Sequence, residues 1–345
     1  MNRNEIEEEL RKKNGTMLSF PDRGPWGDNR YRGNCSGWIH NFLIWKYKID
    51  RLFAELFSGS GTGYDACKDM GVPYVGADLN PSPVRPGILN VNAVTDEVPE
   101  EFRNAQMLFM HPPYGLEIGI PYAGAEWGAE KKWGKVNGKN QCTIIDYTDK
   151  IAKQLGYDPK QYDLGRMEWG LFMKTLNEII MKYYSAMSPG SYMSILMGDV
   201  RRNGKCYSML NDMVKPGELQ QIIIKGQHNC VSNSRTYGNS NFVPIEHEYL
   251  YVLKKAMDAY FINFMLPAKK ELDIRDSKSA SWCDVFQAVL NQLGGKAHYT
   301  EIVKQVSGRK KAEGNNHLPE KTRQVLRAYS KVFTACGNGY YALAA

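Results

Sequence analysis

The stretch MLFMHPPY, residues 107–114, ends an apolar run with a histidine, two prolines and a tyrosine. Neither proline can donate a hydrogen bond to a sheet, so the pair ends a predicted strand abruptly. The prolines also hold backbone carbonyls in a fixed outward position, beside an aromatic ring that offers a stacking face. Such a strand tip can orient a planar amine and sandwich its ring, which a simple turn would not require. The candidate catalytic residues are therefore His111, Pro112, Pro113 and Tyr114.

A second stretch, ELFSGSGTG at residues 55–63, places three glycines directly after another apolar segment. Glycines let the backbone turn sharply and approach a ligand closely, although a tight turn alone would also explain them. Asp78 ends the next predicted strand about twenty residues later, where an acid can accept both hydroxyls of a ribose. Together these features indicate an adenosine-type ligand. An NAD enzyme and a methyl-donor enzyme both fit this pattern.

The elements that must position these residues alternate between strands and helices. Residues 51–71 predict a strand, a glycine-rich turn and a helix that ends at Gly71. Further strands are expected within residues 72–82, 87–94, 104–114, 191–200, 217–226 and 247–255, and further helices within residues 38–48 and 167–187. This alternation predicts the α/β class with a doubly wound, largely parallel sheet. Ligands of such sheets bind beyond the carboxyl ends of the strands.

The two motifs together resemble a known family. ELFSGSGT followed by HPPY resembles the S-adenosylmethionine-dependent amino-methyltransferases of DNA, whose motifs usually read D-x-F-x-G-x-G-T and [DNS]-P-P-[YFW]. RGPWGDNRYRGNCSG, residues 23–37, resembles the loop before the glycine motif in related phage and bacterial methylases. PIEHEYLYVLKK, residues 244–255, resembles their last strand. The resemblance covers about residues 20–255 and implies a Rossmann-like methyltransferase sheet.

This resemblance implies S-adenosylmethionine as the cofactor and an exocyclic amine of a flipped DNA base as the substrate. Adenine N6 is the preferred target and cytosine N4 is the alternative. The residues implied for donor binding are Cys35, Ser36, Glu55, Phe57, Gly59, Ser60, Gly61, Thr62, Asp78 and Asn92. In this assignment Asp78 binds the ribose, and Cys35 and Ser36 lie near the methionine carboxylate.

The sequence departs from the family pattern at two positions. Glu55 replaces the usual aspartate, a change that one extra methylene accommodates. His111 replaces the aspartate, asparagine or serine that accepts a hydrogen bond from the target amine. A neutral histidine can also accept through one ring nitrogen, whereas an imidazolium cannot. We therefore expect activity to fall in acid as His111 becomes protonated.

Composition narrows the cellular setting. The start of the chain is charged and no apolar run reaches the ~18 residues of a membrane span, so neither a secretory signal nor a membrane anchor is expected. Seven scattered cysteines without C-x-x-C pairs indicate reduced thiols and no zinc site. These features favour the cytoplasm of a bacterial or phage-infected cell. A restriction–modification role with a cognate nuclease and a solitary phage-type enzyme both remain open.

The C-terminal segment differs in charge from the rest. Residues 275–345 hold 11 lysines and arginines against 5 acids, so they carry +6 of the net charge of +7. Three predicted helices and a hairpin at Gly337-Asn338-Gly339 are typical of a winged helix-turn-helix domain. VLNQLGGKAHYTEIVKQV resembles the HARE-type version of that domain. The partner expected from this charge and pattern is double-stranded DNA.

The predicted organisation is an N-terminal arm (1–20), a methyltransferase domain (21–255) with a target-recognition insertion (115–165), a linker (256–279) and a winged helix (280–345). Candidate DNA contacts are Arg201, Arg202, Lys205, Arg235, Lys321, Arg323 and Arg327, with the Arg309-Lys310-Lys311 run as a further candidate. Solvated surface charge is the alternative for each of them. Alternative functions are an RNA or protein methyltransferase and a catalytically silent DNA-binding module.

Overall fold

The structure, a computed structural model, describes residues 1–28, 34–81, 83–115, 130–136, 139–145, 155–202, 204–228, 243–257, 264–265 and 273–344. The chain divides into two compact units, Met1–Pro267 and Ala268–Ala345. The predicted DNA contact Arg235 lies outside the described residues, as do residues 116–129, 137–138 and 146–154 of the predicted insertion at 115–165.

The first unit is built on one mixed sheet of eight strands in the order β1-β12-β13-β8-β5-β2-β3-β4. Neighbouring strands run parallel except β13, which is antiparallel to both of its neighbours. The strands are β1 (Met17–Ser19), β2 (Phe53–Leu56), β3 (Tyr74–Asp78), β4 (Ile88–Asn90), β5 (Met107–Met110), β8 (Tyr192–Met197), β12 (Glu218–Gly226) and β13 (His247–Lys254). The predicted α/β class with a largely parallel sheet is confirmed.

Strand order brings the two sequence motifs together. From β2 the chain moves outward to β3 and β4, then returns to β5 on the other side of β2. The register pairs Leu56, the last residue of β2, with Met110, the last residue of β5. The glycine loop and the His-Pro-Pro-Tyr segment therefore start side by side, at the topological switch point where open α/β sheets bind ligands.

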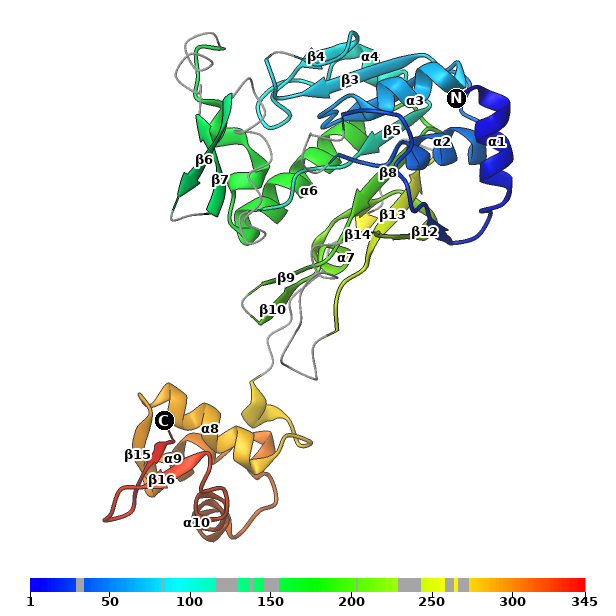
Figure 1. The fold of residues 1–345 in the computed structure, drawn as a ribbon. Coiled ribbons are helices and arrows are strands. Elements are labelled where there is room, and N and C mark those ends of the chain that lie inside the picture. The colour runs from blue at the N-terminus through cyan, green and yellow to red at the C-terminus, as the bar shows by residue number, and fades with distance from the viewer. Residues whose placement is uncertain are drawn as a thin grey trace. The chain divides into compact units, whose positions relative to one another are not determined.

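Helices cover both faces of this sheet (Figure 1). One face packs against α6 (Trp169–Ala186) and the short α4 (Glu100–Arg103). The other packs against α1 (Arg3–Arg11), α2 (Gly37–Lys46) and α3 (Thr62–Met70). Residues within a strand alternate between the two faces, so Leu108 and Met110 belong to the α6 side while Met107 and Phe109 belong to the other.

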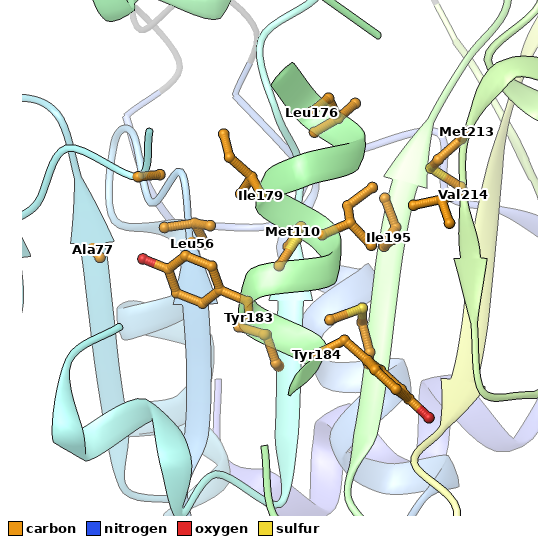
Figure 2. Close-up of a cluster of buried hydrophobic side chains, with 14 of the residues drawn as sticks. Leu56, Ala77, Met110, Leu176, Ile179, Tyr183, Tyr184, Ile195, Met213 and Val214 are labelled. Carbon is orange, nitrogen blue, oxygen red and sulfur yellow. The ribbon is translucent and has the colours of Figure 1, made fainter. Parts of the chain in front are cut away.

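The α6 side holds the larger cluster of buried apolar residues. Figure 2 shows Leu176 and Ile179 of α6 beside Met110 and Ile195 of the underlying strands. Leu176 has no solvent-exposed surface. Burying such a side chain contributes about 1.5–3 kcal/mol, so packing against α6 stabilises the position of β5.

Two features of this unit differ from expectation. The predicted helix at 38–48 forms as α2, but it is buried on every side from Gly37 through Ile44 instead of lying on the surface, because the sheet and α1 enclose it. The N-terminal arm forms α1 as predicted and then adds the short edge strand β1 beside β12. A strand of three residues is too short to leave a periodic pattern.

Smaller elements complete the unit. Two-stranded antiparallel pairs join β6 (Glu130–Val136) to β7 (Lys139–Ile145), β9 (Val200–Arg202) to β10 (Lys205–Tyr207), and β11 (Lys215–Pro216) to β14 (Phe264–Met265). The short helices are η2 (Pro159–Tyr162), η3 (Leu164–Arg166) and α7 (Met209–Asp212).

The second unit has three helices, α8 (Trp282–Gln292), α9 (Tyr299–Val306) and α10 (Leu318–Ala328), around its own apolar core. Its sheet has the order β15-β17-β16, from β15 (Lys296–His298), β16 (Phe333–Ala335) and β17 (Tyr340–Leu343). The hairpin between β16 and β17 turns at Gly337, Asn338 and Gly339, all with positive φ. The short helices η5 (Ile274–Asp276) and η6 (Lys310–Ala312) contact each other in this unit, so part of the predicted linker belongs to it.

Candidate functional site

A cavity of about 920 Å³ lies at the carboxyl ends of β2, β3, β4 and β5. The predicted residues that line it are Cys35, Glu55, Phe57, Gly59, Ser60, Thr62, Asp78, Asn92, His111, Pro112 and Pro113. The lining residues that were not predicted are Asn34, Leu56, Ser58, Leu79, Val91, Ala93, Val94, Tyr162, Asp163, Leu164 and Ile179. Ser36, Gly61 and Tyr114 are the predicted residues of this site that do not line it.

The glycine loop turns at the end of β2 through an unusual backbone path. Phe57, Gly59 and Gly61 all have positive φ, at 68°, 49° and 77°. That conformation is costly for phenylalanine, and strain of this kind gathers at functional sites. Gly61 is the residue before α3, and a Cβ there would lie 2.4 Å from Cγ of Arg85. Gly61 therefore shapes the loop from behind the cavity.

Asp78 ties the loop to the end of β3. Its Oδ2 accepts a 2.8 Å hydrogen bond from the Gly59 N–H, and its Oδ1 accepts a 2.9 Å bond from the Asn80 N–H. Burial raises the pKa of the Asp78 carboxyl, and these two backbone bonds oppose the rise. The carboxylate is thus fixed at the cavity wall, where it can accept further hydrogen bonds.

Glu55 is 3% exposed and its carboxylate is fully engaged. Oε1 lies 2.7 Å from Nε2 of His40, and Oε2 accepts a 2.6 Å bond from the Tyr74 hydroxyl. Burial, followed by the charge of Glu55, raises the pKa of Tyr74 well above its ordinary value. A Cβ on Gly63 would lie 2.3 Å from Oε2 of Glu55, so the longer acid fits because position 63 has no side chain.

The segment before α2 forms another wall of the cavity. The Thr62 hydroxyl donates to Oδ1 of Asn34, which joins this segment to the start of α3. Burial raises the pKa of the Cys35 thiol to about 12, so the thiol stays protonated and unreactive. Ser36 is the N-cap residue of α2, but its hydroxyl makes no capping hydrogen bond and donates instead to the Arg23 carbonyl at 3.4 Å.

Two polar residues face the cavity from its remaining side. Asn92 is 2% exposed, and its Oδ1 accepts a 3.1 Å bond from the Val94 N–H. Asp163 is 4% exposed and accepts bonds from the Gly165 N–H at 2.9 Å and from Nε of Arg166 at 3.3 Å. Burial raises the pKa of Asp163 despite these bonds. The sequence contains no motif that singles out Asp163.

The tip of β5 carries His111 into the cavity but directs Tyr114 elsewhere. The two rings lie 6.3 Å apart between centroids, at an interplanar angle of 82°. The Tyr114 hydroxyl donates a 3.0 Å bond to Oε1 of Glu248 and accepts a 2.8 Å bond from the Gly198 N–H. Tyr114 therefore fastens the segment after β5 to the ends of β8 and β13.

Glu248 connects the residues at this end of the sheet. It is 5% exposed, its Oε1 lies 3.8 Å from Nε2 of His111, and its Oε2 accepts a hydrogen bond from Nζ of Lys225. Burial alone would raise the pKa of Glu248, but Lys225 and His111 hold it well below its ordinary value. Glu248 is therefore an anion within reach of a predicted catalytic residue.

The predicted DNA contacts fall in both units. Arg201, Arg202 and Lys205 are exposed on the β9–β10 hairpin, which follows β8 at the carboxyl edge of the sheet. In the second unit, Arg327 is exposed on α10, whereas Lys321 and Arg323 are partly covered. Arg323 lies over the Tyr299 ring at 5.0 Å.

The predicted basic run at 309–311 is partly neutralised. Nη1 of Arg309 lies 3.2 Å from Asp276 and 3.6 Å from Asp273, and Lys311 lies over the Trp282 ring. The hydrogen bond from Arg275 is the main cause that lowers the pKa of Asp273 to about 2, and Arg309 adds to the effect. Arg309 thus has a structural role that the sequence did not indicate.

The described residues contain neither a candidate membrane span nor a candidate metal cluster. No helix in this part of the chain is long and apolar enough to cross a membrane. Within the same residues no group of three or more histidine, cysteine, aspartate and glutamate side chains is arranged to hold a metal ion.

Comparisons with known proteins add little to this geometry. No protein-family model matches the sequence, and no curated protein matches it. Among solved structures, TrmN from Thermus thermophilus is 14% identical, covers 65% of this chain and 50% of its own length, and superposes with a TM-score of 0.34. The chain thus spans half of that protein.

Two further structures match a similar share of the chain. A SAM-dependent methyltransferase from Archaeoglobus fulgidus is 12% identical over 66% of this chain and 96% of its own, with a TM-score of 0.30. A protein described with the conversion of a disulfide bond into a thioacetal group during echinomycin biosynthesis is 10% identical over 64% and 82%, with a TM-score of 0.33. At these TM-scores we base the functional proposal on the site alone.

Proposed function

We propose that the protein transfers a methyl group from S-adenosylmethionine to the exocyclic amine of a flipped DNA base, with adenine N6 as the preferred target. The observation that carries the proposal is that the glycine loop, Asp78 and the His111–Pro113 segment line one cavity. This shared cavity supports a site in which an adenosine-type ligand and a planar amine would lie next to each other. Neither motif alone would specify that pairing.

The residues of the cavity suit the donor. Asp78 supplies a carboxylate for the ribose hydroxyls, held in place by the N–H groups of Gly59 and Asn80. Apolar side chains offer a surface for the adenine ring, namely Leu79 directly after β3, Val91 directly after β4, and Ile179 of α6. When bound, S-adenosylmethionine supplies an electrophilic methyl group on a sulfonium.

Positioning is the main contribution that the chain makes to catalysis. Bringing two reactants into a near-attack geometry supplies ~7–11 kcal/mol. The buried Pro112 and the partly exposed Pro113 fix the carbonyls at the tip of β5, and His111 accepts a hydrogen bond from the target amine.

A base in a duplex cannot reach this cavity, so it must be extruded at a cost of a few kcal/mol. Stacking on an aromatic ring offsets ~1–3 kcal/mol of such a cost. Because the Tyr114 hydroxyl is anchored to Glu248, we assign Tyr114 to the rim of the cavity, where its ring face supports the incoming base.

DNA is favoured as the substrate by two basic surfaces. Arg201, Arg202 and Lys205 extend from the carboxyl edge of the catalytic sheet on the β9–β10 hairpin. In the second unit, three helices and a three-stranded sheet have the composition of a winged helix, and α10 carries Lys321, Arg323 and Arg327. We propose α10 as its recognition helix. The predicted cytoplasmic setting and restriction–modification role belong to the same proposal.

One experiment separates this proposal from its alternatives. The purified full chain is incubated with S-adenosylmethionine labelled in the methyl group and with separate pools of DNA, RNA and protein. We expect label in DNA, and we expect hydrolysis to release it as N6-methyladenine. Label at cytosine N4 would make cytosine the target base, and label in RNA or protein would show that DNA is not the substrate. DNA binding without any label would indicate a catalytically silent DNA-binding module.

A further inference from the structure

Glu248 is a buried acid that packing does not explain. It is 5% exposed near the start of β13, where the other residues that point inward along the strand are apolar. A carboxylate in such a position is destabilising unless charged or hydrogen-bonding partners compensate for its lost hydration. The chain supplies three partners for it, Lys225 on β12 and both His111 and Tyr114 on the segment after β5.

These partners come from strands and loops far apart in the sequence. Lys225 on β12 is the direct cross-strand partner of Glu248 in the β12–β13 register and donates to its Oε2. The Tyr114 hydroxyl donates to Oε1 at 3.0 Å, and Nε2 of His111 lies 3.8 Å from the same oxygen. Hydrogen bonds at catalytic residues are often long without substrate and shorten when it binds.

The orientation of His111 has a chemical consequence. A neutral imidazole carries its proton on one nitrogen, and the partner of that nitrogen selects the tautomer. With Nε2 facing a carboxylate, the proton resides on Nε2 and the lone pair resides on Nδ1. In this tautomer His111 is uncharged, and the lone pair on Nδ1 is the acceptor that the target amine needs.

We propose that Glu248 is a positioning residue that holds His111 in the Nε2–H tautomer, so that Nδ1 accepts the proton of the amine being methylated. This inference rests on the proposed methyl transfer. The amine nitrogen forms its bond to the methyl carbon as the carbon–sulfur bond breaks, and that electron pair passes to sulfur. The nitrogen then gives one proton to Nδ1, and the resulting imidazolium, stabilised by Glu248, releases it to solvent.

Lys225 completes the arrangement by charge balance. A lone buried carboxylate would favour the imidazolium, which cannot accept a hydrogen bond. Paired with Lys225, Glu248 presents little net charge to His111 before the reaction. Among the described residues, the remaining titratable groups near this pair are the Tyr114 hydroxyl and the Cys35 thiol.

The test uses three variants of the full chain. E248Q removes the charge and keeps the shape, K225M removes the opposing charge, and E246Q is the matched control on an exposed acid two residues away. We expect E248Q to lower kcat by about tenfold or more with the donor KM unchanged, and we expect E246Q to behave as wild type.

The pH profiles distinguish positioning from simple structural support. In E248Q the remaining Lys225 opposes a second positive charge, so the acid limb of kcat should move to lower pH. In K225M the unbalanced carboxylate favours the imidazolium, so the limb should move to higher pH. If the acid limbs of the two variants move in the same direction, or do not move, the inference is overturned, even if kcat is low in both variants.

A second measurement does not depend on activity. Histidine-selective nitrogen NMR of the full chain, with the His111 signals assigned by H111Q, reports the tautomer directly. We expect the Nε2–H tautomer of His111 in wild type and in E246Q. We expect E248Q to lose the preference for this tautomer, and if E248Q does not fold, K225M takes its place in this comparison. Nδ1–H in wild type overturns the inference. If no acceptor is methylated, the proposed function fails and the NMR result still decides whether Glu248 positions His111.

Discussion

The hydroxyl of Tyr114 donates a 3.0 Å hydrogen bond to Oε1 of Glu248, although 134 positions separate the two residues in the sequence. The same hydroxyl accepts a 2.8 Å bond from the Gly198 N–H. The segment after β5 is therefore fastened to the ends of β8 and β13. This anchoring keeps His111 beside Glu248 and gives the cavity a rigid rim.

The close approach of Gly63 to Glu55 leads to the first prediction. In G63A the new Cβ would lie 2.3 Å from Oε2 of Glu55, so the loop or the acid must move. We expect a loss of about 1–3 kcal/mol of stability from this overpacking and about tenfold weaker binding of S-adenosylhomocysteine, measured by urea denaturation and calorimetry. G170A in α6 is the matched control, because nothing lies within 4 Å of its Cβ. Equal behaviour of the two variants would contradict the role of Gly63.

The second prediction concerns acid and donor binding. Burial raises the pKa of Asp78, so the folded state takes up a proton more readily than the unfolded chain. The ionised carboxylate is therefore a cost to stability above that pKa, and acid relieves the cost. Donor binding has the opposite dependence, because the ribose hydroxyls need the carboxylate as acceptor.

Calorimetric titration of S-adenosylhomocysteine between about pH 7 and pH 4 checks this dependence. Affinity should fall as the pH is lowered, beginning above the ordinary aspartate range. D78N should bind more weakly at neutral pH and lack this dependence, while D50N, on an exposed residue, should follow wild type. A D78N variant that retains the pH dependence would assign it to another group.

The third prediction compares a buried and an exposed leucine of α6. Leu176 is fully buried against the sheet, whereas Leu171, one turn earlier on α6, is 56% exposed. L176A should lower the free energy of unfolding by about 2–5 kcal/mol, and L171A by no more than about 0.5 kcal/mol. Urea denaturation measures both. Similar losses would mean that α6 does not pack as described.

The fourth prediction compares two arginines of the second unit. Arg327 is exposed on α10, and no ion pair involving it is seen within residues 273–344, whereas Arg309 contacts Asp273 and Asp276. R327A should weaken duplex binding and reduce the slope of log K against log salt by about 0.9. R309A should leave that slope unchanged. Fluorescence anisotropy over a range of salt concentrations measures both, and a larger slope change for R309A would contradict the assignment.

Local patterns predicted the frame of the site well. The apolar run, glycine turn and helix at 51–71 became β2, the loop and α3, and MLFM became β5, because short-range signals mark strand ends clearly. The parallel order then placed both loops at one edge. The contact of Glu55 with Gly63 also follows from this frame, although only the structure shows it.

The partners of the predicted residues could not be found in the same way. Lys225 and Asp163 belong to segments without a motif, and the resemblance of residues 244–255 to a last strand did not single out Glu248. Lys225 and Glu248 meet only through the register of β12 and β13. His40 lies within an apolar helix, and nothing in that part of the sequence indicates that its side chain contacts Glu55. The direction of the Tyr114 hydroxyl likewise depends on β13, which the sequence placed in the sheet without its neighbours.

The most direct test is a crystal structure of the full chain with S-adenosylhomocysteine. The account predicts density in the described cavity, with the ribose hydroxyls on Asp78, the adenine ring between Val91 and Ile179, and the sulfur facing the His111–Pro113 segment. A ligand bound outside this cavity, or inside it with its sulfur end turned away from His111, would contradict the central claim.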